Sequence, residues 1–360
     1  MTRDTPTSET TTVAVVSAAA EDPGNDISAE PVDSHYSKSQ TAIQSLSAIL
    51  PSIPPSLSTS PNPSHSLLHD PQVSTQISTL LRHPSSGTGD NHLCRWLYDT
   101  FQSGDPHLQL VVICYVPVIA CAYLSRATLR RPLAGFEAIL LALYAHETTS
   151  RAGQPLTVNI PDMSHPSLYH EPTTPTKNNS TSLHLAVVSP SLEPHRTVRS
   201  TRRAWIVGVA MELYYSKIYA MPTSSKVEFC EFVRVWAGEQ RDESEGESGP
   251  SELGEGKRIS LPWELLQPIM RTLGHCVVGC GRNKEIFDAA MAACKGLHGR
   301  AVHDINPKAI LATESLLRLG NISLEPDDDA DYRQLVTDET MLALNYELQV
   351  EDSETSIGLA

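Results

Sequence analysis

The sequence predicts an all-α fold made of stacked antiparallel helix hairpins. Apolar residues recur at three- and four-residue spacing in about nine segments, whereas strand-like alternation is almost absent. Cap-then-proline pairs begin several of these segments, and the connections between most of them are short. No internal repeat of fixed period is found, but successive hairpins with apolar faces on both sides bury those faces by stacking. We therefore expect a solenoid-like helical body.

The helical domain is predicted to cover residues 34–324, after a disordered start over residues 1–33 that is rich in Thr, Ser, Glu and Pro. Its first two helices are expected at His35–Leu50 and Gln72–Leu81. Between them, residues 51–66 hold many prolines and serines, which is typical of a linker. The expected apolar sides are Ala42, Ile43, Leu46, Ile49 and Leu50 in the first helix, and Val73, Ile77, Leu80 and Leu81 in the second.

The next helix is predicted to begin at Asp90 as N-cap and to end at Gly104. Its apolar face consists of Leu93, Trp96, Leu97 and Phe101. The pair Asp105-Pro106 then supplies a cap and a first helical residue for the following helix. A basic connection, Ser125–Arg131, leads from there to the next helical segment.

The segment Leu108–Leu124 is almost entirely apolar and could be taken for a membrane span. It has 17 residues, which is at the short limit for crossing a bilayer, and it contains Gln109 and a central Pro117. A helix that is buried on all sides is the better interpretation, and Pro117 is expected to kink it. An integral membrane protein remains the alternative at this point.

The stretch Pro132–Pro172 combines a helix, a short β-like segment and a proline-rich run. Pro132 suits a first helical position. The buried face of this helix is predicted to be Phe136, Ile139, Leu140, Leu143 and Tyr144. Three prolines in Ile160–Pro172 exclude a continuing helix, yet the run keeps Leu168 and Tyr169. We therefore expect an ordered, extended strap that lies across the helical body.

The second half of the chain continues the helical pattern around two polar insertions. Residues 173–195 read as a surface loop with room for a short strand at Leu183–Val188, and residues 239–256 read as a disordered acidic loop. An acidic tail, 325–360, follows the last helix and contains one weak helical pattern at Glu339–Leu348. The expected helices are Arg196–Ser216, Thr223–Trp236 with Thr223 as cap, Ser260–Val278, Asn283–Cys294, and Asn306–Leu319 with Asn306-Pro307 as its start and Gly320 as its end.

The charge distribution argues against nucleic-acid binding. The net charge is −15, from 42 acidic and 27 basic residues. Three segments hold 25 of the acidic residues: residues 1–33 and 239–256 have seven each, and residues 325–360 have eleven. Each segment contains a single basic residue. The remaining body has 17 acidic and 24 basic residues and is therefore about +7. Peripheral contact with an anionic membrane is compatible with this charge.

The cysteine pattern indicates reduced thiols in the cytosol. The number of cysteines is odd, and most of them fall inside apolar helical patterns. They are Cys94, Cys114, Cys121, Cys230, Cys276, Cys280 and Cys294. No signal-peptide, myristoylation or prenylation pattern is found, so we expect a cytoplasmic protein.

One family resemblance is specific. The helix Phe136-Glu137-Ala138-Ile139-Leu140-Leu141-Ala142-Leu143-Tyr144, followed by Ile160-Pro161 and a Ser-x-Pro-Ser-x-Tyr-His-Glu-Pro run, resembles the signature of the hyccin family. The order of elements from Ser37 to Gly320 is also similar. The sequence departs from the family pattern in two places: it has no long Ser-rich extension of the kind that animal members carry, and its region from Pro51 to Ser66 is unusually rich in Pro and Ser. We expect a plant-type member. The motif residues, which we expect to form the strap, are Pro161, Ser164, Pro166, Ser167, Tyr169, His170, Glu171 and Pro172.

This resemblance implies a non-catalytic scaffold subunit of the plasma-membrane phosphatidylinositol 4-kinase complex. The implied partners are a tetratricopeptide-repeat scaffold subunit, phosphatidylinositol 4-kinase type III alpha, and an acylated helical-repeat protein that anchors the assembly to the membrane. The chain itself would be cytoplasmic and recruited peripherally. We expect its N-terminal helices, His35–Phe101, to lie against the helical-repeat partner. Basic residues that could face the membrane or a partner are Arg126, Arg130, Arg131, Arg196, Arg199, Arg202 and Arg203.

A soluble metal-dependent hydrolase is the competing hypothesis. His170-Glu171 lacks the second histidine of a zinc-protease helix, and the flanking prolines prevent such a helix. His275, Cys276 and Cys280, with His298 and His303 as further candidates, could form a partial zinc site. Cys276 and Cys280 are also four residues apart in an apolar helix, which favours core packing. Because no phosphate-binding glycine loop and no kinase signature occurs, we predict no cofactor and no catalytic residue.

Overall fold

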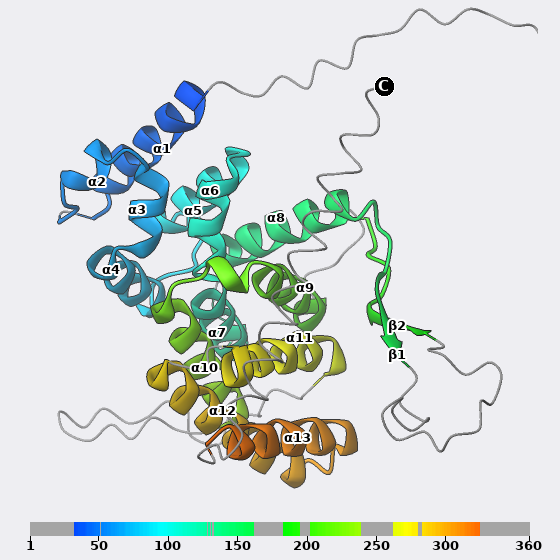
Figure 1. The fold of residues 1–360 in the computed structure, drawn as a ribbon. Helices are drawn as coiled ribbons and strands as arrows, with labels where there is room; N and C mark the ends of the chain where they lie inside the picture. Colours follow the sequence, from blue (N-terminus) through cyan, green and yellow to red (C-terminus); the bar gives the residue numbers. More distant parts are fainter. Residues whose placement is uncertain are drawn as a thin grey trace, which may run out of the picture.

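A computed structural model of the chain describes residues 32–50, 52–127, 129, 131, 133–161, 183–194, 202–238, 262–279 and 283–324. Over these residues the predicted all-α fold is confirmed, with thirteen α-helices and one two-stranded antiparallel sheet (Figure 1). The stack runs from α1 at one end of the molecule to α13 at the other, and neighbours in it are often distant in sequence, as with α5 and α8 or α7 and α10. The predicted disordered start, residues 1–33, is outside the described residues up to residue 31, and its last two residues belong to α1. The predictions for residues 239–256 and 325–360 lie outside the described residues.

The N-terminal end of the stack contains more helix than the sequence indicated. Its helices are α1 (Val32–Ser47), α2 (Ser56–Thr59), α3 (Pro63–His69), α4 (Pro71–Arg82) and α5 (His92–Gln102). The predicted linker over residues 51–66 instead holds α2 and the start of α3, and Leu57 in α2 is buried. Two of the prolines mark helix starts: Pro55 is the N-cap of α2, and Pro63 follows Asn62, which caps α3.

The long apolar segment forms two helices, α6 (Pro106–Ile113) and α7 (Val116–Ala127). They are bent by 43° at the break between them, which confirms the kink predicted for Pro117. Pro117 is the second residue of α7, where its missing amide hydrogen has no helical partner to lose. Among the described residues, no single helix is long and apolar enough to cross a membrane; α6 and α7 pass that test only together.

Helix α8 (Ala134–Ser150) leads into the sheet formed by β1 (Leu156–Pro161) and β2 (Leu183–Ser189). The predicted core face of α8 is buried, but the helix begins at Ala134, and the predicted start at Pro132 lies outside the described residues. The strands pair antiparallel, with Val158 opposite Ala186. This hairpin stands away from the helices (Figure 1), and the predicted strap lies outside the described residues from residue 162 on.

The second half of the stack consists of α9, α10, α11, α12 and α13. Helix α9 packs against α8 and α11, α10 packs against α12, and α13 packs on α12 as the last layer. The helices are α9 (Arg203–Ser216), α10 (Thr223–Ala237), α11 (Trp263–Gly274), α12 (Lys284–His303) and α13 (Pro307–Leu324). A 3-10 turn, η3 (Ile218–Ala220), follows α9, and a π-helical turn, η4 (His275–Gly279), extends α11.

Several helix ends differ from the prediction, and α12 runs to His303, nine residues beyond the predicted end at Cys294. Asn91, and not Asp90, caps α5, since its side chain accepts a hydrogen bond from the Cys94 amide at 2.9 Å. Thr223 is already helical, and Pro222 precedes it as the N-cap of α10. Gly320 lies inside α13, where its missing side chain leaves room for Met291. The predicted caps Asp105 and Asn306 are confirmed, because both accept hydrogen bonds from backbone amides.

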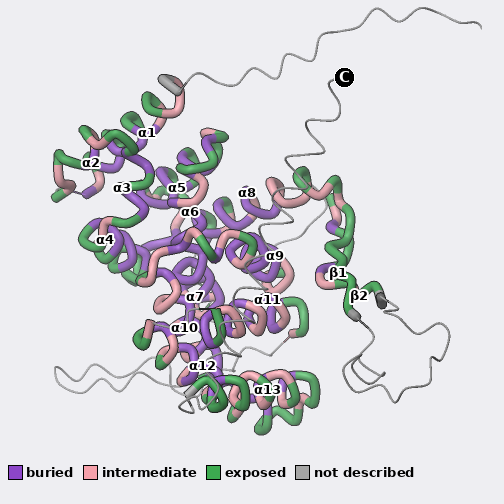
Figure 2. Tube along the Cα trace, viewed as in Figure 1, coloured by how far each residue is buried: buried purple, intermediate pink, exposed green. Residues whose placement is uncertain are grey.

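One continuous apolar core runs through the stack (Figure 2). The predicted apolar faces of α5 and α8 are buried, and those of α1 and α10 are buried apart from Ile49 and Val227, which are half-buried. Leu80 is an exception, since it is 39 % exposed on the outer side of α4. The largest fully buried side chains are Tyr123, Tyr144, Tyr214, Phe136 and Phe229.

Candidate partner-binding surface

A groove of about 780 Å³ runs between α1 and α5 at the N-terminal end of the stack, and we call it the α1–α5 groove. Its floor is apolar where Ala42, Trp96 and Leu108 meet, while charged side chains, including Lys38 and Asp99, line it too. Clefts of this size that combine apolar walls with a few polar groups are typical binding sites. The remaining lining residues are Ser37, Thr41, Ser45, Ala48, Ile49, His92, Arg95, Thr100 and Ser103.

The floor of the groove is held by hydrogen bonds between elements distant in sequence. The indole Nε1 of Trp96 donates to the carbonyl of Ala42 at 2.9 Å, and both residues are buried. This bond joins the middle of α5 to the middle of α1. A buried Trp whose N–H has found a partner is a rigid element of the surface that it supports.

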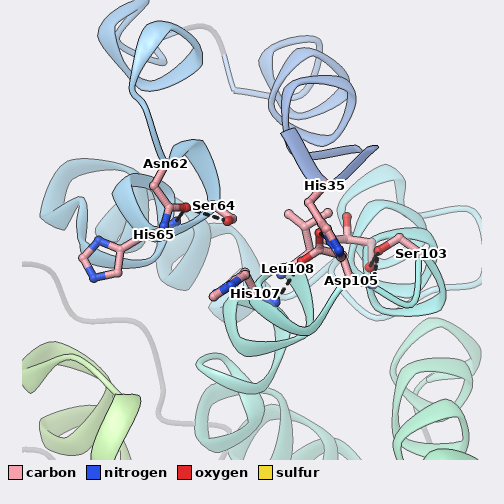
Figure 3. Close-up of polar contacts among 9 residues, drawn as sticks. His35, Asn62, Ser64, His65, Ser103, Asp105, His107 and Leu108 are labelled. Carbon is pink, nitrogen blue, oxygen red and sulfur yellow. Dashed lines mark hydrogen bonds and ion pairs between the residues drawn. The ribbon is translucent and has the colours of Figure 1, made fainter. Parts of the chain in front are cut away.

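Asp105 joins α1 to the start of α6, as Figure 3 shows. It is only 1 % exposed, and its Oδ1 accepts from the amides of His107 at 2.8 Å and Leu108 at 3.1 Å. Its Oδ2 accepts from Nδ1 of His35 in α1 at 2.7 Å. Burial raises the pKa of Asp105, but the hydrogen bond from His35 and the two amides outweigh it, so the pKa lies below its usual value. An ionised, buried carboxylate therefore holds α1 against the start of α6.

Arg126 is not a surface residue, which corrects the prediction that it faces a membrane or a partner. It is 9 % exposed, and its guanidinium points at the end of α4. It donates to the carbonyls of Arg82 and Ser86 at 2.8 Å and of His83 at 2.9 Å, and to Oγ of Ser86 at 2.8 Å. A cation at the end of a helix also interacts favourably with the helix dipole. Arg126 thus braces α7 against α4.

The other basic residues predicted to face a membrane or partner do not form a bare positive patch over the described residues. Arg202 pairs with Glu193, and Arg203 lies 3.7 Å from Glu137. Arg131 is exposed in the connection before α8. The remaining three, Arg130, Arg196 and Arg199, lie outside the described residues.

The residues considered for a zinc site are dispersed where the structure describes them. The Cys276 thiol is buried beside Cys230, whose pKa is raised by the hydrogen bond between the two thiols and by burial. His298 bonds to Thr313 at 2.9 Å, and His303 bonds to Asp304 at 3.0 Å. Over the described part of the chain, no three His, Cys, Asp or Glu residues lie together as metal ligands. Cys280 lies outside it.

Most of the family motif lies outside the described residues. Pro161 ends β1, whereas Ser164 to Pro172, including His170 and Glu171, are not described. Neither the structural role nor the catalytic role that was considered for His170-Glu171 is therefore tested.

The opposite end of the stack exposes apolar side chains on its last helix. Leu311 and Leu319 of α13 are 70 % and 46 % exposed. Trp263 at the start of α11 lies nearby, with the ammonium of Lys308 5.1 Å from its ring centre. A helical stack needs a polar cap or a partner at its ends, so this face is a second candidate surface.

Sequence reasoning missed the groove and the brace of Arg126. The signal for Asp105 was present, because an Asp-Pro pair before an apolar run marks a helix start. No sequence signal places His35 next to Asp105, because the two residues are 70 positions apart. No sequence signal places Arg126 at the end of α4 either, and its basic neighbours indicated a surface segment.

A comparison with protein-family models matches residues 58–340 to the family described as Hyccin. The match begins within α2 and ends beyond α13, so it includes the other helices of the stack, the hairpin and the motif around Tyr169. Helix α1, one wall of the α1–α5 groove, lies before it.

Proposed function

Because the chain belongs to the hyccin family, whose members are non-catalytic subunits of phosphatidylinositol 4-kinase complexes, we propose that it is a scaffold that stabilises such a complex at the plasma membrane and supports synthesis of phosphatidylinositol 4-phosphate. Its partners in this proposal are the kinase of type III alpha, a tetratricopeptide-repeat scaffold subunit and an acylated helical-repeat protein. The chain makes and breaks no covalent bond in this role.

The α1–α5 groove is the observation that best supports a helical partner. Its apolar floor and charged lining suit an amphipathic helix, which would place apolar side chains over Trp96 and polar ones beside Lys38 and Asp99. Helical-repeat proteins present such helices in arrays. The floor is already fixed by the bond from Trp96 to Ala42, so binding requires little ordering of the groove itself.

A scaffold of this kind acts through binding free energy. A partner that is bound in its folded form is stabilised by mass action, and it becomes less abundant when the scaffold is lost. Permanent interfaces typically bury more than about 2,000 Å². Fourteen residues line the groove, fewer than the roughly 20–30 on each side of even a standard interface, so the interface would extend along α1 to α5 beyond it.

Peripheral membrane contact in this proposal involves fewer residues than the sequence suggested. Arg126 is committed to the end of α4, which leaves Arg131, Arg202 and Arg203 among the described basic candidates. The last two are partly neutralised by acidic neighbours. Recruitment would therefore depend mainly on the acylated partner, with the basic residues adding a weaker attraction to anionic lipid.

Paired variants of one helix test the scaffold role. Deleting residues 1–84 would remove core residues such as Leu46 and Ile77, so point substitutions are sharper. Ser45 and Ser47 are both exposed on α1, but only Ser45 lines the groove. We expect Ser45→Arg to reduce co-purification of the complex from membranes by about tenfold or more, since an unpaired buried charge costs more than about 1.4 kcal/mol. Ser47→Arg should leave it unchanged.

Both variants should keep the thermal stability of the original chain, because neither side chain is buried. Phosphatidylinositol 4-phosphate at the plasma membrane should fall with Ser45→Arg only. Equal co-purification of the two variants would show that the groove is not the interface. Turnover of any lipid substrate by the purified chain alone, or stoichiometric zinc in it, would contradict the non-catalytic role and favour a hydrolase.

A further inference from the structure

The β1–β2 hairpin exposes apolar side chains on both of its faces. Leu156, Val158 and Ile160 alternate along β1 on one face, and Leu185 and Val187 of β2 lie on the other. Leu185 and Val187 are 67 % and 60 % exposed, although both belong to a regular strand. An isolated two-stranded hairpin is at best marginally stable in water, and three strands are usually needed.

The strand register shows where an apolar neighbour is missing. Leu185 is paired with Asn159, and Val187 is paired with Thr157, so both face polar residues on β1. Directly opposed side chains on one face of a sheet are its main stabilising contacts. Among the described residues, no strand lies at the other edge of β2, so a strand added there would supply the missing apolar contact.

The free edge of β2 is also the better template for an added strand. β1 follows Pro155 and ends at Pro161, and proline has no amide hydrogen to donate to a further strand. β2 contains no proline from Leu183 to Ser189, so each of its residues has both an amide donor and a carbonyl acceptor. An unpaired edge of this kind recruits another extended segment.

The acidic tail contains a segment with strand periodicity. In Leu342–Val350 every second residue is large and apolar, and the residues between are Ala, Asn, Glu and Gln. This segment overlaps the weak helical pattern expected at Glu339–Leu348, but strict alternation over this length favours a strand with one apolar face. A helix over the same residues would spread the apolar side chains around its circumference. The apolar residues are Leu342, Leu344, Tyr346, Leu348 and Val350.

We propose that Leu342–Val350 of the same chain adds to the free edge of β2 as a third strand, with its apolar side chains beside Leu185 and Val187. Strand addition of this type uses main-chain hydrogen bonds for affinity and alternate side chains for specificity. The connection over residues 325–341 spans up to about 60 Å when extended. A compact domain of this size has a radius of gyration of about 19 Å, so the segment can reach the hairpin.

Amide hydrogen exchange on the full-length chain tests the proposal. Peptides over residues 183–189 and 342–350 should exchange about tenfold or more slowly than unstructured controls. Leu344→Lys with Leu348→Lys should abolish this protection in both peptides. The matched control, Asn345→Lys with Gln349→Lys, adds the same charge on the alternate face and should preserve it. Neither pair alters the helical core, so exchange of α8 to α12 should be the same in all chains.

Val187→Lys supplies the reciprocal test from the hairpin side and should also abolish protection of residues 342–350. Unprotected amides over 342–350 in the original chain, or equal effects of the two lysine pairs, would overturn the proposal. Protection that grows with protein concentration would show pairing with a second copy instead. Helical rather than extended backbone chemical shifts over 342–350 would likewise refute it.

Discussion

Replacing Arg126 with methionine should destabilise the fold more than any change to an exposed arginine. The guanidinium satisfies three buried or half-buried carbonyls and one hydroxyl at the end of α4, at 2.8 to 2.9 Å. Methionine keeps most of the aliphatic volume but donates no hydrogen bond. Each buried acceptor left without a donor costs about 1–3 kcal/mol, and part of this is recovered where water can enter. We expect a loss of about 3–5 kcal/mol.

The assay is thermal unfolding of the purified chain, followed by circular dichroism at 222 nm. A loss of this size should lower the melting temperature by about 10 °C in a domain of more than 200 residues. The melting temperature of Arg126→Lys should lie between those of Arg126→Met and the original chain, since an ammonium can reach some but not all of the carbonyls. Arg318 is 75 % exposed and pairs with Glu314 on one helix, so Arg318→Met is the control and should change stability by less than about 0.5 kcal/mol.

The reasoning would be refuted if Arg126→Met melted within about 2 °C of the original chain, since that corresponds to less than about 1 kcal/mol. It would also be refuted if amide exchange over α4 were unchanged while the rest of the protein loosened. The brace joins α7 to α4, so the last turn of α4 should respond first.

Asp105→Ala should cost about 1–2 kcal/mol at neutral pH through loss of the cap. Because the pKa of Asp105 is lowered in the folded chain, its contribution to stability is present above the usual pKa of an aspartate and is lost as the pH falls below about 4. Urea unfolding at several pH values should therefore show the stabilities of Asp105→Ala and the original chain converging in acid. Gly208→Ala should lower the free energy of unfolding by about 1–3 kcal/mol, since a Cβ there would lie 2.5 Å from a backbone oxygen of α11. Gly299→Ala, where nothing lies within 4 Å of the added Cβ, should raise it by about 0.5–1 kcal/mol. Unfolding midpoints that move in the same direction for both variants would contradict the packing argument. Burial raises the pKa of Cys94 to about 11 and that of Cys114 to about 12. Neither thiol should therefore react with iodoacetamide at pH 8 in the folded chain. Peptide mapping that finds either cysteine alkylated would show that the N-terminal end of the stack opens.

The apolar faces of the helices could be predicted because burial follows the helical period directly. The faces of α5 and α8 are buried as expected, and that of α1 is buried apart from Ile49. The break near Pro117 was equally predictable, because it follows from the covalent structure of proline. Leu80 shows the limit of this argument, since a residue at the margin of an apolar face can point either way.

The Pro-rich region was predicted wrongly because proline was interpreted in two ways, as a linker residue here and as a helix start elsewhere. Residues 51–66 were taken as a linker on their proline content. Yet Asn62-Pro63 and Asp70-Pro71 are the same cap-then-proline starts that correctly placed α6. Proline ends a helix from within but begins one from its first turn, and the preceding residue decides between the two.

The candidate surface could not be predicted from the sequence, because it depends on residues brought together by packing. The groove exists where α1 crosses α5, and its floor depends on the bond from Trp96 to Ala42, 54 residues away. The basic cluster around Arg126 indicated solvent exposure. Arg126 instead binds the carbonyls at the end of α4, and this position follows only from the packing of α4 on α7.

The link between Arg126 and the end of α4 also has a consequence for synthesis on the ribosome. The chain emerges from its N-terminus, so the carbonyls at Arg82 and Ser86 are made well before the side chain that binds them. Until residue 126 has left the exit tunnel, this end of the domain stays open to solvent and to chaperones. Any nascent fragment that stops earlier is therefore expected to be a target for degradation rather than a folded intermediate.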